Sequence, residues 1–107
     1  LGLEVVRENY RADRGSYKLD VKLGDCELEI FSFPGSPQRL TRPEACGLRH
    51  LAFRVADIHE AVAELERRGV EVEPIRLDAY TGDLYTFFMD PDGLPLELKQ
   101  CAAPGQN

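Results

Sequence analysis

The stretch LRHLAFRVADIHEAVAELERRG, residues 48–69, decides the fold because two structural periods follow one another in it. Apolar side chains alternate with polar or small ones over residues 48–55, as in a half-buried strand, and this alternation places His50 on the face opposite the apolar one. Asp57 and Glu60 then form a capping box, and apolar residues recur at 58, 61, 62 and 65 along one helical stripe. The stretch predicts a strand followed by an amphipathic helix that ends at Gly69.

Further strands are predicted on both sides of this strand–helix pair. A Gly-Asp turn at residues 24–25 predicts a tight hairpin between two alternating segments. Residues 34–47 hold three prolines and two glycines without a period, which indicates a linker or a functional loop. Three strands are predicted before the linker and three after the helix: residues 3–10, 17–23 and 26–33, then 70–78, 84–89 and 95–99.

An internal repeat relates the two halves. Gly2-Leu3-Glu4-Val5 recurs 67 residues later as Gly69-Val70-Glu71-Val72, and Tyr17 and Glu29 recur 68 residues later as Tyr85 and Glu97. Self-similarity at a nearly fixed offset indicates a duplicated supersecondary unit. The second half reads as a complete βαβββ module, and the first half matches only its last three strands. The sequence therefore predicts an α+β fold of paired βαβββ modules, with the first module incomplete at its N-terminus.

Composition excludes several classes of protein. The 107 residues fit one domain, and 13 basic against 19 acidic residues give a net charge of −6, which disfavours nucleic-acid binding. No apolar run approaches the ~20 residues of a membrane span, and no leader segment is apparent. Three cysteines without CxxC spacing fit a reducing, cytoplasmic location, with Cys26 expected in the core. Because the chain starts with Leu1, we expect that a preceding segment is absent.

Three side chains suit a shared metal site. His50, Glu29 and Glu97 each lie on the polar side of a predicted strand, and pairing of the two halves would bring them together. One imidazole with two carboxylates favours a borderline divalent ion over Mg²⁺ or Ca²⁺. Two alternatives stay open. The first is that Glu29 and Glu97 are simply solvated residues on an exposed sheet face. The second is that Glu27 is the ligand in place of Glu29, because the two share a face and periodicity does not choose between them.

Four segments carry a resemblance to a known family. The chain resembles the vicinal oxygen chelate superfamily, which includes glyoxalases, bleomycin-resistance proteins and dioxygenases, and within it the small glyoxalase I-like bacterial proteins. The similar segments are LRHLAF (48–53), FFMDPDGLPLEL (87–98), EIFSFP (29–34) and RPEACG (42–47).

The resemblance implies a fold and a ligand set. The fold is a single glyoxalase-like domain whose modules form a curved, barrel-like mixed sheet. Its parts are a partial first module (1–33), a linker (34–47), a complete second module (48–101) and a tail (102–107). His50, Glu97 and Glu29 match the ligands of one divalent ion (Ni, Co, Zn, Mn or Fe), and a fourth ligand, a His, would precede residue 1. A homodimer is also implied.

The activity that the resemblance implies is that of a lyase or isomerase acting on a small oxygen-chelating substrate. Glu97 or Glu29 would abstract a proton next to a carbonyl, giving a metal-stabilised enediolate. Tyr80, Tyr85 and Arg39 are weaker candidates for substrate contacts. The alternatives are a non-catalytic drug-binding module of the bleomycin-resistance type and an extradiol dioxygenase. Dioxygenases of this superfamily use two His and one Glu, so Glu29 favours the glyoxalase-like branch.

Overall fold

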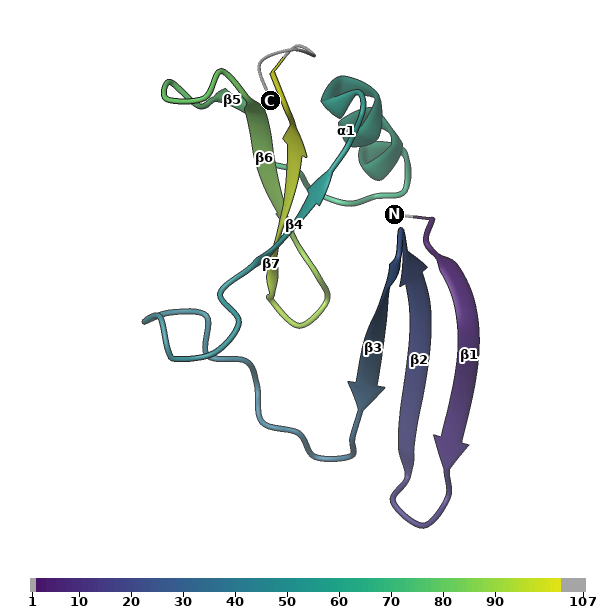
Figure 1. The fold of residues 1–107 in the computed structure, drawn as a ribbon. Coiled ribbons are helices and arrows are strands. Elements are labelled where there is room, and N and C mark those ends of the chain that lie inside the picture. Colours follow the sequence, from purple (N-terminus) through teal and green to yellow (C-terminus); the bar gives the residue numbers. More distant parts are fainter. Residues whose placement is uncertain (1, 103–107) are drawn as a thin grey trace. The chain divides into compact units, whose positions relative to one another are not determined.

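The computed structural model describes residues 2–102 and divides the chain into two compact units, Leu1–Gln38 (unit 1) and Arg39–Asn107 (unit 2) (Figure 1). Each unit has its own sheet, and the sheet of unit 2 is mixed, so the predicted α+β class is confirmed. The barrel-like pairing of the two sheets stays a prediction. The elements are β1 (Glu4–Arg11), β2 (Ser16–Leu23), β3 (Cys26–Ser32), β4 (Leu51–Arg54), α1 (Ile58–Arg67), β5 (Arg76–Leu77), β6 (Leu84–Met89) and β7 (Pro95–Gln100).

Unit 1 is an antiparallel sheet in the order β1-β2-β3. The predicted hairpin turn is confirmed: Leu23 pairs with Cys26, and Gly24 between them has a φ of 59°, which glycine adopts without strain. Glu29 pairs with Asp20, so the two share one face, as the alternation predicted. The expectation that Cys26 is buried is wrong, because this residue lies at the hairpin end of β3 and is exposed.

Unit 2 is a four-stranded sheet in the order β4-β7-β6-β5, in which β4 runs parallel to β7 and the other neighbours are antiparallel. The helix α1 connects β4 to the edge of this sheet, so unit 2 is a complete βαβββ module (Figure 1). Phe53 pairs with Leu98, which also pairs with Thr86, and all three side chains are buried on the same face. With Ile58 and Leu65 of α1 they form the core of the unit.

The ends of α1 follow from the residues that the sequence places there. Asp57 accepts a hydrogen bond from the backbone N–H of Glu60 at 3.1 Å, as a capping residue does. Gln100 of β7 accepts the N–H of Ile58 at 2.8 Å and so fixes the helix start against the sheet. The predicted helix is thus confirmed. Within residues 2–102, no helix is long and apolar enough to cross a membrane.

Two predicted strands are shorter than expected. The strand expected over residues 48–55 is limited to β4, which leaves His50 directly before it. The strand expected over residues 70–78 is reduced to β5 and an isolated bridge between Val72 and Phe88. Pro74 lies between these two parts and has no N–H to donate to a neighbouring strand. The Thr86 hydroxyl instead donates to the carbonyl of Glu73 at 2.6 Å.

Asp83 holds the end of β7 to the start of β6. Its Oδ1 accepts the N–H of Ala102 at 2.7 Å, and Lys99 Nζ lies 3.3 Å from Oδ2. The Ala102 hydrogen bond, and secondly Lys99, lower the pKa of Asp83 below its usual 3.8, although burial acts in the opposite direction. The ionised form is therefore the one that the fold stabilises.

We expect the stabilisation by Asp83 to be present above pH 3.8 and to be lost as the pH falls through the lowered pKa of the folded state. Replacing Asp83 with asparagine should lower the melting temperature at neutral pH. The difference from the unmodified chain should shrink as the pH falls below 3.8 and through the lowered pKa, where the folded unmodified chain also carries a neutral carboxyl. Thermal unfolding followed by circular dichroism measures the two melting temperatures. An equal difference between the two proteins at neutral and at acidic pH would contradict this expectation.

Candidate metal centre

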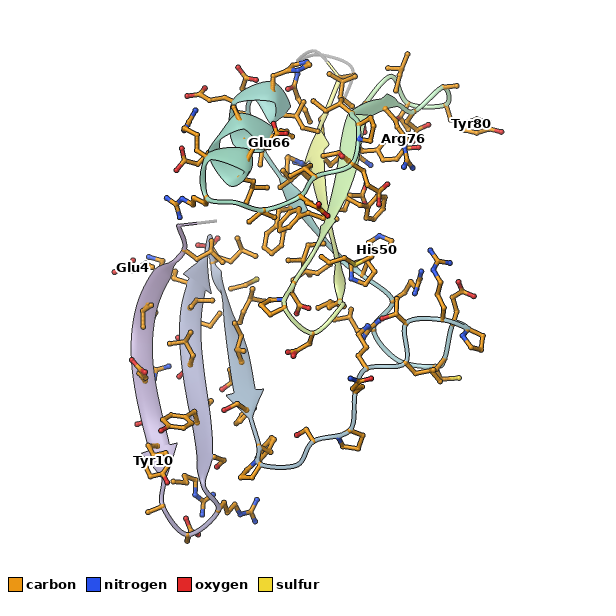
Figure 2. All side chains as sticks on the ribbon, turned by 180° about the vertical axis from the view of Figure 1, so that it is seen from behind. Glu4, Tyr10, His50, Glu66, Arg76 and Tyr80 are labelled. Carbon is orange, nitrogen blue, oxygen red and sulfur yellow. The ribbon has the colours of Figure 1, made fainter. Side chains whose placement is uncertain are left out.

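His50 and Glu97 meet on the face of the unit 2 sheet opposite the core. The parallel pairing of β4 with β7 sets Leu51 beside Leu96 and Ala52 beside Glu97. His50 directly precedes β4 (Figure 2). Its Nε2 lies 3.1 Å from Oε1 of Glu97. The structure thus brings together two of the three predicted ligands, from segments almost fifty residues apart.

Aromatic side chains flank this pair. Phe87 of β6 pairs directly with Glu97 and meets the His50 ring edge-to-face, with the ring centroids 5.3 Å apart. Tyr85 lies two residues before it on the same face, 6.2 Å from the Phe87 ring. The side chain of Glu97 is 16% exposed and that of His50 is 38% exposed. The pair is therefore partly shielded from water and open on one side.

Hydrogen bonds from the preceding linker hold the backbone next to His50. The Arg39 guanidinium donates to the carbonyls of Leu48 and Arg49, the second at 3.0 Å. Arg49 donates to the carbonyl of Thr41 at 2.8 Å, and the Thr41 hydroxyl donates to the carbonyl of Gly93 at 2.9 Å. These contacts give Arg39 a positioning role, in contrast to the substrate contact considered for it.

Tyr80, the other loop residue considered for a substrate contact, lies between β5 and β6 with its side chain fully exposed (Figure 2). Within residues 39–102, nothing encloses it. Tyr85 is the better placed of the two tyrosines, because it lies beside Phe87 on the face that carries Glu97.

Glu29 lies in unit 1 within a network of charged side chains. Lys18 Nζ is 2.5 Å from Glu29 Oε1 and 3.5 Å from Asp20 Oδ1. The hydrogen bond to Glu29 raises the pKa of Lys18, against the effect of desolvation. Glu27 is held differently, because Arg7 bridges it to Asp20 with both distances at 2.9 Å. Glu29 and Glu27 therefore share a face and differ in their cationic partner.

The His50–Glu97 geometry fits a divalent ion. Two ligand atoms about 2.1 Å from one ion, at angles between octahedral and tetrahedral values, lie roughly 3.0–3.4 Å apart. The observed 3.1 Å, which is also the length of a direct contact between the two side chains, is compatible with this separation, and imidazole nitrogen with carboxylate oxygen is a common donor set for borderline metals. Over residues 2–102, no cluster of three or more His, Cys, Asp or Glu side chains is close enough to share an ion. A role for Glu29 beside this pair remains a prediction.

Sequence comparison gives close relatives over most of the chain. The family model described as Glyoxalase/Bleomycin resistance protein/Dioxygenase superfamily matches residues 1–98. An uncharacterized Bacillus subtilis protein, YwkD, is 60% identical over 99 residues, which are 92% of this chain and 77% of that protein. An uncharacterized Escherichia coli protein, YaeR, is 58% identical over the same shares of the two chains.

Solved structures agree with the sequence comparison. A glyoxalase family protein from Enterococcus faecalis is 56% identical, with a TM-score of 0.82 over 92% of this chain and 78% of that one. The structure titled SMU.1112c is 53% identical, with a TM-score of 0.85 over 92% of this chain and 80% of that one. A glyoxalase I mutant from Zea mays, at 18% identity and a TM-score of 0.78, covers 95% of this chain and 38% of its own and shares the fold.

Proposed function

The chain belongs to the glyoxalase/bleomycin resistance protein/dioxygenase superfamily, and from that premise we propose that it is a metal-dependent lyase or isomerase of the glyoxalase type. Its substrate would be a small molecule that chelates the ion through neighbouring oxygens. The observation that carries the proposal is the 3.1 Å approach of His50 Nε2 to Glu97 Oε1 beside an aromatic wall. The relative from Enterococcus faecalis, titled a glyoxalase family protein, supports it.

The three site residues of unit 2, His50, Glu97 and Phe87, have different roles in this proposal. A bound divalent ion would act as a Lewis acid and make the C–H next to a coordinated carbonyl more acidic. His50 would hold the ion through Nε2, its ring orientation fixed by the edge contact with Phe87. Glu97 would hold the ion through one carboxylate oxygen and serve as the general base when it moves toward the substrate carbon. Phe87, directly opposite on β6, would exclude water from one side of that carboxylate.

Glu29 would supply the second carboxylate. Lys18 Nζ lies 2.5 Å from Oε1 of Glu29, so Glu29 would bind an ion through Oε2 or would give up its contact with Lys18. Its side chain is 57% exposed, which leaves room for either arrangement. Either Glu29 or Glu97 would then be the base, and the other would remain a ligand.

Replacing His50 with alanine is expected to abolish stoichiometric metal binding. The chain has two histidines, and the other, His59, is exposed on α1, so His59→Ala is a matched control that should bind metal normally. Elemental analysis of protein dialysed against Ni²⁺, Co²⁺ or Zn²⁺ should give about one ion per chain, with His50→Ala near zero. Absence of metal from the unmodified chain would contradict the proposal and favour a non-catalytic ligand-binding module.

The same proteins test the chemistry. In deuterated water, metal-loaded protein should catalyse exchange of the protons next to the carbonyl of hydroxyacetone, followed by NMR. His59→Ala should retain this exchange and His50→Ala should lose it. Metal binding without hydrogen–deuterium exchange would support the ion site and contradict proton abstraction as its chemistry.

A further inference from the structure

Unit 1 contains a cavity of about 490 Å³ whose lining is positively charged. Arg11, Arg14 and Lys18 contribute three cationic side chains, and the lining residues include no carboxylate. The chain as a whole has a net charge of −6, so a lining with three cations and no carboxylate runs against its composition. The volume falls within the range typical of small-molecule sites. The charge favours an anionic occupant.

One of the three cations is free to bind such an anion. Arg11 lies 3.2 Å from Asp13, and Lys18 is paired with Glu29. Among residues 2–102, Arg14 has no ion pair, and its guanidinium makes no hydrogen bond to another side chain. A guanidinium binds a carboxylate through two parallel hydrogen bonds, which is stronger than a neutral contact.

The cavity also has a flat apolar wall. The rings of Phe31 and Phe33 are stacked, with centroids 5.8 Å apart and planes 8° apart. Both line the cavity and are about half exposed, at 53% and 47%. Lys18 Nζ lies 5.7 Å from the centre of the Phe31 ring. Exposed parallel rings beside cations favour a ligand that has an aromatic or planar group next to its negative charge.

The cavity lies on the sheet face that carries Glu29. Lys18 pairs directly with Phe31, and Glu29 precedes Phe31 by two positions on β3, so all three share that face. We propose that this cavity binds a small aromatic carboxylate. The proposal concerns unit 1 alone and does not depend on the proposed function.

Phenylacetate is the probe, with 2-phenylethanol as its neutral counterpart, and binding is measured by calorimetry to chelator-treated protein. Phenylacetate should bind about tenfold more tightly than 2-phenylethanol, since a charge-assisted hydrogen bond contributes on that order. Arg14→Gln should remove this preference, and Arg42→Gln, the same change at an exposed arginine of unit 2, should leave it unchanged. Phe31→Ala should weaken both ligands, and Ile30→Ala, which is similarly exposed at 51% on the opposite face of β3, should weaken neither.

Equal binding of phenylacetate and 2-phenylethanol, or an undiminished preference in Arg14→Gln, would overturn the proposal. No saturable binding of either compound would overturn it too. These outcomes are independent of the metal centre, because the ion is absent from the assay. Conversely, if the chain binds phenylacetate as expected but does not bind metal, this result supports the cavity site and contradicts the proposed function.

Discussion

Replacing Glu29 with glutamine is expected to weaken the binding of a divalent metal ion by at least about 100-fold, since even the outer partners of metal ligands contribute 10–100-fold. Glutamine has nearly the same size and removes the negative charge, so the change isolates the carboxylate. It also removes the 2.5 Å partner of Lys18, whose Nζ keeps its 3.5 Å approach to Asp20. The loss of the carboxylate charge is therefore what weakens metal binding. Isothermal titration with Ni²⁺ or Zn²⁺ measures the change.

Glu27→Gln is the matched control for this experiment. Glu27 lies on the same strand and face as Glu29, two positions away, and is similarly exposed, at 46% against 57%. It is bound to Arg7, and its replacement should leave metal affinity within about twofold of the unmodified value. The reverse result would assign the ligand to Glu27. Unchanged affinity in both variants would exclude Glu29 and Glu27 as ligands and would fit the three-ligand pattern of the dioxygenase alternative.

Local signals were sufficient for the helix and for the faces of the strands. The capping contact of Asp57 with Glu60 is made within one turn of α1, so neighbouring residues determine it. The alternation that set His50, Glu29 and Glu97 apart from the apolar residues depends only on the period of a strand. Predictions of this kind need no knowledge of which strands are neighbours. The registers of β3 and β7 agree with them for Glu29 and Glu97, whereas His50 lies directly before β4 and outside the strand.

The repeat was a weaker guide than the alternation. Tyr17 and Tyr85 stand at the same offset as Glu29 and Glu97, which suggested equivalent positions. The hairpin registers differ by one residue, so Tyr85 shares a face with Glu97, whereas Tyr17 lies on the face opposite Glu29. A shift of one residue reverses the face of a side chain, and sequence offsets do not determine the register across loops of different length.

The neighbours of the predicted ligands were missed for the same reason. Phe87 meets His50 through the β6–β7 register, and Lys18 meets Glu29 across β2 and β3. The tight Gly24 turn was a signal from which the position of Lys18 could have been counted, because a two-residue hairpin fixes the pairing. The longer turn before β7 gives no such constraint, so the contact of Phe87 required the structure.

Replacing Leu98 with alanine is expected to lower the free energy of unfolding by about 3.5 kcal/mol, the middle of the range for a fully buried leucine. Its side chain is completely buried, and it is the point at which three elements of unit 2 meet. It pairs with Phe53 of β4 on one side and Thr86 of β6 on the other, and α1 covers it. Alanine would leave a cavity that all three neighbours would have to fill by moving inward.

Leu77→Ala is the control for this change, because Leu77 on β5 is 64% exposed and its truncation should alter stability by no more than about 0.5 kcal/mol. Urea unfolding followed by circular dichroism measures both variants. Equal stability of the two would show that the described core is not the one that stabilises the fold. Because Glu97 precedes Leu98 on the same strand and points to the other face, a folded Leu98→Ala protein should still bind metal, which separates the core of β7 from its proposed ligand.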